Sequence, residues 1–192
     1  MDRRYIEAFL ERHAADIRGR VLEVKDSAYT RRFGGSRVDT AEVLDVDATN
    51  PAATIVDDLA RGERLPSNAF DCIVLTQTLH LVFDVRAAVA TLHRILRPGG
   101  VLLLTAPGIT QVPRAEAESW YWSFTDRALS RLMEREFGGG SVETRVHGNV
   151  LAATAFLYGL AAHELSDAEL DAIDPDYPLI VTVRAVKTSA GR

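Results

Sequence analysis

The sequence predicts a three-layer α/β domain built on a mostly parallel sheet. Short apolar segments alternate along the chain with segments of helical periodicity. Residues 70–75 are apolar almost throughout, as expected of a strand that is buried on both faces. Strands that alternate with helices form parallel sheets with helices packed on the faces, so we expect one domain over residues 1–192.

The first half of the chain is expected to contain one helix and four strands. Apolar residues recur at helical spacing from Ile6 to Ile17, which predicts an N-terminal helix over 3–17, within 1–18, that ends near Gly19. Four strands are expected, at 21–25, 42–47, 54–56 and 70–75. The stretch between the first two contains Gly34 and Gly35 and leaves little room for a helix, so this crossover is expected to be unusually short.

The second half continues the alternation and adds an insertion. Asp84 and Thr125 are expected to cap the starts of two helices. The glycine-containing turns at 98–100 and 138–140 are expected to end them. The expected elements are a helix over 85–96, a strand over 101–105, a helix over 125–137, and strands over 142–147 and 179–187. Residues 149–176 precede the last strand and are expected to form a helical insertion that begins with an apolar helix over about 150–162.

Composition and charge exclude several classes of protein. Apolar residues make up 47% of the chain and charged residues 26%, which is typical of a folded globular domain. The net charge of -5 is spread along the chain and provides no basic surface for nucleic acid or an anionic membrane. Cys72 is the only cysteine, which excludes an intramolecular disulfide and a cysteine-based zinc site. With no signal peptide or apolar span visible, we expect a cytoplasmic protein.

Two ordered motifs resemble one family. Residues 65–75, LPSNAFDCIVL, followed by Leu79 and His80, are similar to the fourth strand of the class I S-adenosylmethionine-dependent methyltransferases of the type 11 kind. Residues 96–102, LRPGGVL, are similar to the turn into that family's fifth strand. The resemblance covers most of the chain and implies a Rossmann-like methyltransferase fold with a seven-stranded sheet.

The resemblance also implies that S-adenosylmethionine binds at the carboxyl end of the first strand. The acidic residue that ends this strand in the family is present as Glu23, but the glycines that follow it are absent, because residues 23–29 read EVKDSAY. Lysine occurs only at Lys25 and Lys187. Lys25 is expected either to pair with Glu23 or Asp47 or to bind a carboxylate of the cofactor.

Three further cofactor-binding residues are implied at the ends of the next strands. Asp47 is the candidate acceptor for the ribose hydroxyls, and Asp45, on the same side of the strand, is the alternative. Asp58, beside Asp57, is the candidate near the adenine amino group, and Gln77 follows the fourth strand. Each carboxylate could instead serve a turn or the solvated surface.

The acceptor side of the site is expected after the fourth and fifth strands. His80 is a candidate general base, and the alternative is a partly buried histidine with a structural hydrogen bond. Residues 109–124 are expected to form an aromatic lid in which Trp120, Tyr121 and Trp122 bind the acceptor, for example a sugar face. The alternative is that these rings only pack a long loop.

The sequence therefore predicts an enzyme that transfers a methyl group to an oxygen or nitrogen of a small-molecule or glycan acceptor. The alternative, supported by the glycine-free loop and the short crossover, is a methyltransferase-fold protein that has lost its cofactor and acts by association. A Rossmann-type oxidoreductase is disfavoured because no G-x-G-x-x-G follows the first strand. The helix over 150–162 is apolar on nearly all sides and is expected, with 165–173, to form a homodimer interface.

Overall fold

A seven-stranded sheet in the order β3-β2-β1-β4-β5-β7-β6 forms the centre of the computed structural model, which describes residues 1–114 and 118–188. Neighbouring strands from β3 to β5 are parallel, and β7 runs antiparallel to both β5 and β6. The strands are β1 (Gly19–Val24), β2 (Val38–Asp45), β3 (Ile55–Val56), β4 (Phe70–Thr76), β5 (Leu96–Pro107), β6 (Val142–His147) and β7 (Ile180–Val186). The predicted mostly parallel sheet is confirmed.

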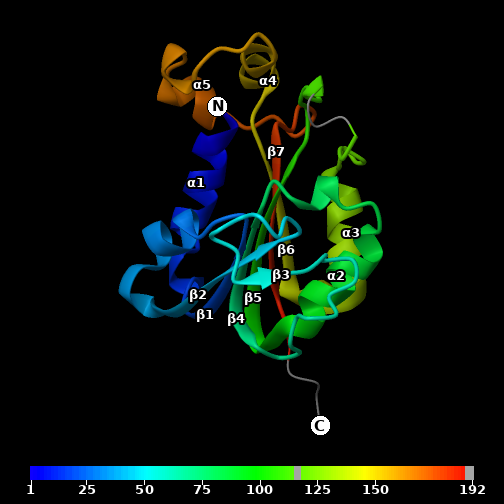
Figure 1. Ribbon diagram of the computed structural model, residues 1–192. Helices are drawn as coiled ribbons and strands as arrows, with labels where there is room; N and C mark the ends of the chain where they lie inside the picture. The colour runs from blue at the N-terminus through cyan, green and yellow to red at the C-terminus, as the bar shows by residue number, and fades with distance from the viewer. Residues whose placement is uncertain (115–117, 189–192) are drawn as a thin grey trace.

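Helices cover both faces of this sheet (Figure 1). Helices α2 (Val85–Ile95) and α3 (Asp126–Phe137) lie on one face, and α1 (Asp2–Arg12) lies on the other. Each of the first two begins where expected, because Asp84 accepts a hydrogen bond from the Ala87 amide and Thr125 accepts one from the Ala128 amide. Helices α4 (Val150–Leu157) and α5 (Asp167–Asp171) form the insertion between β6 and β7.

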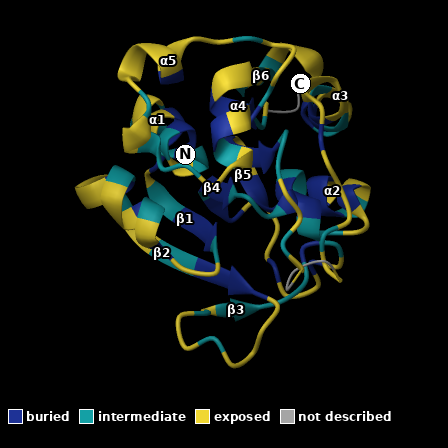
Figure 2. Cartoon of the chain, turned by 90° about the horizontal axis from the view of Figure 1, so that it is seen from above, coloured by how far each residue is buried: buried dark blue, intermediate teal, exposed yellow. Residues whose placement is uncertain are grey.

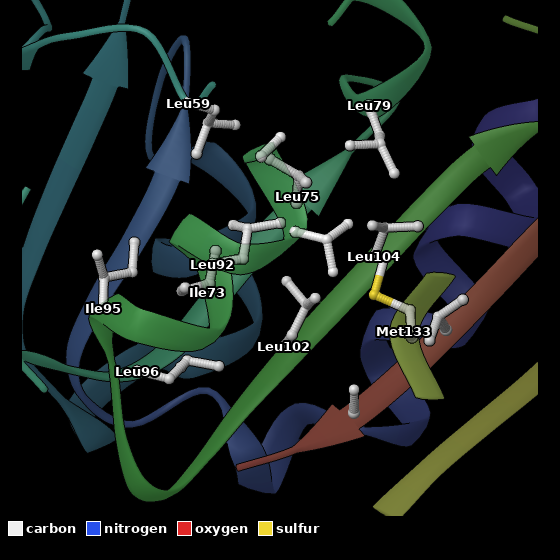
Figure 3. Close-up of a cluster of buried hydrophobic side chains, with 14 of the residues drawn as sticks. Leu59, Ile73, Leu75, Leu79, Leu92, Ile95, Leu96, Leu102, Leu104 and Met133 are labelled. Carbon is white, nitrogen blue, oxygen red and sulfur yellow. The ribbon is translucent and has the colours of Figure 1, made fainter. Parts of the chain in front are cut away.

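The sheet separates two apolar cores. The core on the α2 and α3 face is made largely of leucine and isoleucine side chains from β4, β5 and α2, as Figure 3 shows for Ile73, Leu92 and Leu104. The core on the α1 face is smaller and includes Phe9 and Leu10 of α1 with Leu103 of β5. Both faces of the central strands are therefore buried, which explains why β4 and β5 are apolar almost throughout.

Several expected boundaries differ from the structure, and strand β5, expected over 101–105, spans Leu96–Pro107. The N-terminal helix ends at Arg12, and a 3₁₀ turn over Ala14–Asp16 follows in place of the last helical turn. Strand β2 ends at Asp45 rather than residue 47, because the Asp45 carboxylate accepts a hydrogen bond from the Asp47 amide and turns the chain. Helix α4 ends at Leu157 rather than near residue 162, and Gly159 follows with a φ of 78°.

The crossover from β1 to β2 is short, as predicted. It contains a π turn over Thr30–Gly34 and a 3₁₀ turn over Gly35–Arg37 in place of an α-helix. A Cβ at Gly34 would lie 2.9 Å from Ile17 Cγ2 and would also clash with the Val38 side chain. Only glycine lets this compressed connection lie so close to the sheet.

Helix α4 lies over the carboxyl ends of β4 and β5 when the molecule is viewed from above (Figure 2). It buries Ala152, Ala153 and Ala155. Its other side is exposed, with Leu157 52% and Tyr158 82% accessible. Within residues 1–114 and 118–188, no helix has the length and apolar character needed to cross a bilayer.

Replacing Gly108 with alanine should lower the free energy of unfolding by about 1–3 kcal/mol, because the added Cβ would collide with the Pro178 carbonyl at the start of β7. The Gly108 amide also donates to the Leu179 carbonyl over 2.9 Å, so the two segments cannot simply separate. Urea denaturation would measure the change. Gly139→Ala is the matched control, because nothing lies within 4 Å of a Cβ at that position. Equal stability of the two variants would contradict this packing.

Candidate active site

Strands β1 and β4 are neighbours at the centre of the sheet. The chain continues from β1 to β2 on one flank and from β4 to β5 on the other, so the two connections diverge between β1 and β4. Such a switch point opens a crevice at the carboxyl ends of the strands. A cavity of about 500 Å³ lies there, and we call it the donor cavity. Its lining residues are Arg3, Glu7, Glu23, Val24, Lys25, Asp26, Ala28, Tyr29, Arg32, Thr76, Gln77, Thr78 and Leu81. Three of the predicted cofactor residues, Glu23, Lys25 and Gln77, are thus brought together.

Glu23 holds the loop that follows β1. The carboxylate is only 3% exposed and accepts hydrogen bonds from the amides of Tyr29, at 3.2 Å, and Thr30, at 2.8 Å. Burial raises the pKa of Glu23, and the Thr30 and Tyr29 hydrogen bonds oppose that shift. Both carboxylate oxygens are therefore occupied within the loop, and the expected pairing of Glu23 with Lys25 is not present.

Lys25 and Gln77 adopt left-handed backbone conformations, with φ values of 73° and 45°. Such conformations are strained for residues other than glycine, and they concentrate at functional sites. The Gln77 side chain donates to Thr105 Oγ1 over 3.1 Å. Among the residues that the structure describes, no hydrogen bond or ion pair engages the Lys25 ammonium group. Lys25 lines the donor cavity, and its charge also helps to lower the pKa of Asp47, one of its two expected partners.

The predicted aspartates lie outside the donor-cavity lining. Asp47 is exposed, and its carboxylate accepts from the amide and hydroxyl of Thr49, which lowers the pKa of Asp47. Asp58 accepts from the Ala60 amide over 2.8 Å. Asp45 is 5% exposed and binds Asn50, whose amide group also donates to the Lys25 carbonyl. Asp47 and Asp58 both stabilise turns, and Asp45 is linked to the loop of the donor cavity.

A second cavity of about 240 Å³ adjoins the first, since Gln77 and Leu81 line both. We call it the acceptor cavity. It is bounded by the carboxyl end of β5, the start of β7 and the insertion helix α4. Its lining residues are Asp2, Gln77, His80, Leu81, Pro107, Thr110, Gln111, Pro113, Trp120, Phe156, Leu179 and Ile180. Two joined compartments of unequal size suit a reaction between a larger and a smaller ligand.

His80 lies in the wall of the acceptor cavity and is only 3% exposed. Burial lowers the pKa of His80 to about 4, so the ring is neutral at physiological pH. Its Nδ1 atom is buried without a hydrogen-bond partner among the described residues, which differs from the expected alternative of a satisfied structural histidine. A neutral imidazole of this kind can accept a proton or a hydrogen bond from a ligand.

The three predicted aromatic residues have different positions. The Trp120 ring lies 4.2 Å from the His80 ring, centroid to centroid, and lines the acceptor cavity. Trp122 donates its indole N–H to the carbonyls of Val82 and Phe83, and Tyr121 packs edge-on against Phe83. Tyr121 and Trp122 therefore anchor the segment outside the cavity. The predicted lid over 109–124 includes residues 115–117, which lie outside the described residues.

Helix α1 contributes residues that the sequence interpretation did not find. Arg3 and Glu7 line the donor cavity, and Asp2 lines the acceptor cavity. Arg4 fixes the helix against α5 through ion pairs of 2.9 Å with Asp167 and 2.8 Å with Asp171. No local pattern predicts this placement, because it depends on ion pairs between the two ends of the chain.

Comparison with known proteins finds a family model that matches about half of the chain. A family model described as a methyltransferase domain matches residues 10–104, which span β1 to most of β5. No curated protein sequence matches the chain.

Solved structures share the fold at low sequence identity. A SAM-dependent methyltransferase from Archaeoglobus fulgidus is 12% identical with a TM-score of 0.62, covering 96% of this chain and 94% of that one. The Burkholderia thailandensis 1,6-didemethyltoxoflavin-N1-methyltransferase, solved with bound 1,6-didemethyltoxoflavin and S-adenosylhomocysteine, is 15% identical with a TM-score of 0.60, covering 97% of this chain and 78% of that one. The cyclase SpnF is 16% identical with a TM-score of 0.65, covering 97% and 81%.

Replacing His80 with phenylalanine should make the folded protein less sensitive to acid. The folded-state pKa of about 4 lies below the ordinary value of 6.5, so the folded protein binds fewer protons between these values. The stability linked to His80 is complete above pH 6.5 and is lost as the pH falls toward 4. The wild type should therefore lose on the order of 3 kcal/mol more than His80→Phe over this interval in urea denaturation.

Burial also lowers the pKa values of His13, His93 and His147, and these residues contribute equally to both proteins. Parallel stability curves for wild type and His80→Phe would contradict a depressed His80 pKa.

Proposed function

The chain belongs to the class I S-adenosylmethionine-dependent methyltransferases, and we propose that it transfers a methyl group to an oxygen or nitrogen of a small-molecule or glycan acceptor. The observation that carries this proposal is the pair of cavities joined at Gln77 and Leu81 at the switch point of the sheet. The larger cavity would hold the methyl donor and the smaller one the acceptor.

The donor cavity suits an amino-acid zwitterion. Its volume of about 500 Å³ lies within the range of small-molecule sites. Arg32 is paired with Glu7 at 2.7 Å, so the lining cations that form no close ion pair with a described residue are Lys25 and Arg3, and these two would bind a carboxylate. Ser27, in the glycine-free loop, is 7% exposed and does not line the cavity, and the cavity remains open beside the loop residues that do line it.

When bound, S-adenosylmethionine supplies a methyl group on a sulfonium. This methyl group is a strong electrophile, and its transfer needs no acid catalyst. The chain would then mainly have to orient the acceptor and exclude water. The apolar walls provided by Pro107, Phe156 and Leu179 suit the second task. The neutral His80 ring, whose Nδ1 atom has no hydrogen-bond partner among the described residues, would accept a hydrogen bond from a hydroxyl or amine acceptor and so orient it.

The second candidate function is a methyltransferase-fold protein without catalytic activity. Its support is that Lys25 and Tyr29 stand in the first loop where the family has glycines, and that Asp45 already has hydrogen-bond partners within the chain. The likeness to the cyclase SpnF is a further reason to test the reaction directly, because a shared fold does not define a shared chemistry. Binding of the cofactor distinguishes the two candidates.

Calorimetric titration with S-adenosylmethionine and S-adenosylhomocysteine tests the proposal. We expect both to bind, and Lys25→Gln to weaken binding about tenfold, because the loss of one charge-assisted hydrogen bond removes about 1.5 kcal/mol. Lys25→Arg, which keeps the charge, should retain most of the affinity. Transfer of a deuterated methyl group to small hydroxyl and amine compounds would then be followed by mass spectrometry. Absence of binding heat for the wild type would favour the inactive alternative.

We also propose that the chain forms a homodimer through α4 and the segment 165–173. The exposed apolar side chains there are Val150, Leu151, Leu157, Tyr158 and Ile173. The neighbouring charged residues are mostly acidic, among them Glu164, Asp167 and Asp171, so an anionic membrane surface is disfavoured. A second copy of the chain is the partner that would cover this surface.

Light scattering at micromolar concentration should give the mass of a dimer. Leu157→Glu combined with Tyr158→Glu should produce a monomer, because two buried charges without partners would oppose association. Phe83→Glu is the control, since Phe83 is 70% exposed and lies after η4 (Leu79–Leu81), outside the predicted interface. A monomeric wild type, or a dimer that survives the double substitution, would refute this interface.

A further inference from the structure

Two buried side-chain nitrogens beside the acceptor cavity have no hydrogen-bond partner among the described residues. They are Nδ1 of His80 and Nε1 of Trp120, and both residues line this cavity. The two rings lie 4.2 Å apart between centroids, yet their nitrogens do not bond one another. Buried polar groups are nearly always paired, and an unpaired one is unfavourable. Packing of the chain alone therefore does not account for these two nitrogens.

Backbone contacts hold the two rings together. The His80 carbonyl accepts hydrogen bonds from the amides of Tyr121, at 3.0 Å, and Trp122, at 3.2 Å, and these two residues directly follow Trp120. The Trp122 indole donates its own N–H to two backbone carbonyls. One indole N–H thus anchors the segment, whereas the Trp120 N–H remains without a partner in the wall of the cavity.

The lining of the acceptor cavity disfavours anions. Asp2 is the one charged residue in the described lining, since the His80 ring is neutral. A carboxylate or phosphate ligand would meet a like charge and no cation there, so its burial would be unfavourable. Apolar walls come from Pro107, Phe156 and Leu179, beside the Trp120 ring. The cavity therefore suits an uncharged ligand with a flat apolar body.

We propose that the acceptor cavity binds an uncharged, flat hydroxyl compound, such as a phenol, whose hydroxyl group donates to His80 Nδ1 and accepts from Trp120 Nε1. Such a compound would be the methyl acceptor, and in that respect the assignment rests on the proposed function. A hydroxyl group has one proton to donate and lone pairs that accept, so a single group serves both nitrogens. An indole N–H can only donate, and an unprotonated imidazole nitrogen accepts. His80 and Trp120 thereby select the acceptor.

The two indole N–H groups provide a direct test, because the chain contains two tryptophans and each gives one indole signal in a proton–nitrogen correlation spectrum. Titration with phenol should move the Trp120 signal downfield, since its N–H gains an acceptor. The Trp122 signal should stay nearly in place, because its N–H is already bonded. Trp120→Phe and Trp122→Phe identify the two signals. A Trp120 signal that phenol leaves in place, with and without S-adenosylhomocysteine, would overturn the inference.

Matched probes separate the hydroxyl contact from simple burial of a ring. Phenol should bind about fivefold more tightly than anisole, whose oxygen accepts but cannot donate. His80→Phe should remove this preference, because the nitrogen that accepts from the hydroxyl is lost. His93→Phe is the control and should retain it, since His93 lies in α2 and does not line the cavity. Equal affinity for phenol and anisole, or tighter binding of benzoate or methyl glucoside than of phenol, would contradict the assignment.

The same spectra distinguish failure of this inference from failure of the proposed function. If S-adenosylmethionine binds and phenol does not move the Trp120 signal, the acceptor class is wrong and the proposed methyl transfer stands. If phenol moves the signal as expected and neither S-adenosylmethionine nor S-adenosylhomocysteine binds, the cavity takes a hydroxyl compound and the proposed methyl transfer fails.

Discussion

The buried Glu23 carboxylate holds the loop after β1 against the sheet, and the donor cavity depends on that contact. Its two oxygens accept from the amides of Tyr29 and Thr30, which begin the short π-helical turn over Thr30–Gly34. The first amides of a helical turn have no partner within it, and leaving them buried and unpaired would be unfavourable, so the carboxylate caps this turn. The short crossover that follows, compressed at Gly34, can then return to β2 without closing the crevice.

Loops in this chain replace helices that a longer α/β domain would have, and side chains stabilise those loops. Between β2 and β4, aspartate, asparagine and threonine side chains bind nearby amides, as Asp47 does with Thr49 and Asp58 with Ala60. The same residue types are the ones that bind sugars and bases. A loop built in this way therefore contains many carboxylates, of which few are free to bind a ligand.

The sequence predicts the sheet, α2 and α3 well, because their apolar periodicity and capping residues are local signals. The sequence also predicts that Glu23, Lys25 and Gln77 lie at one cavity, since the carboxyl ends of β1 and β4 are adjacent in any sheet of this order. It does not bring Asp47 and Asp58 to that cavity, because alternation gives the side of a strand but not the amide that a carboxylate binds. The contribution of α1 depends on long-range ion pairs and has no local signal.

Lys25 and Gln77 share a left-handed backbone, but only one of the two side chains is explained by the fold. Gln77 donates to Thr105 Oγ1 and so links the ends of β4 and β5. The Lys25 backbone is fixed by Leu44 and Asn50, and glycine would make the same backbone contacts without the strain of about 1 kcal/mol or more. The charge of Lys25 acts on the exposed Asp47, whose pKa it helps to lower, but no described residue forms a hydrogen bond or close ion pair with the ammonium group. A negatively charged ligand in the donor cavity would supply that contact, which gives a lysine at this position a role that glycine could not fill.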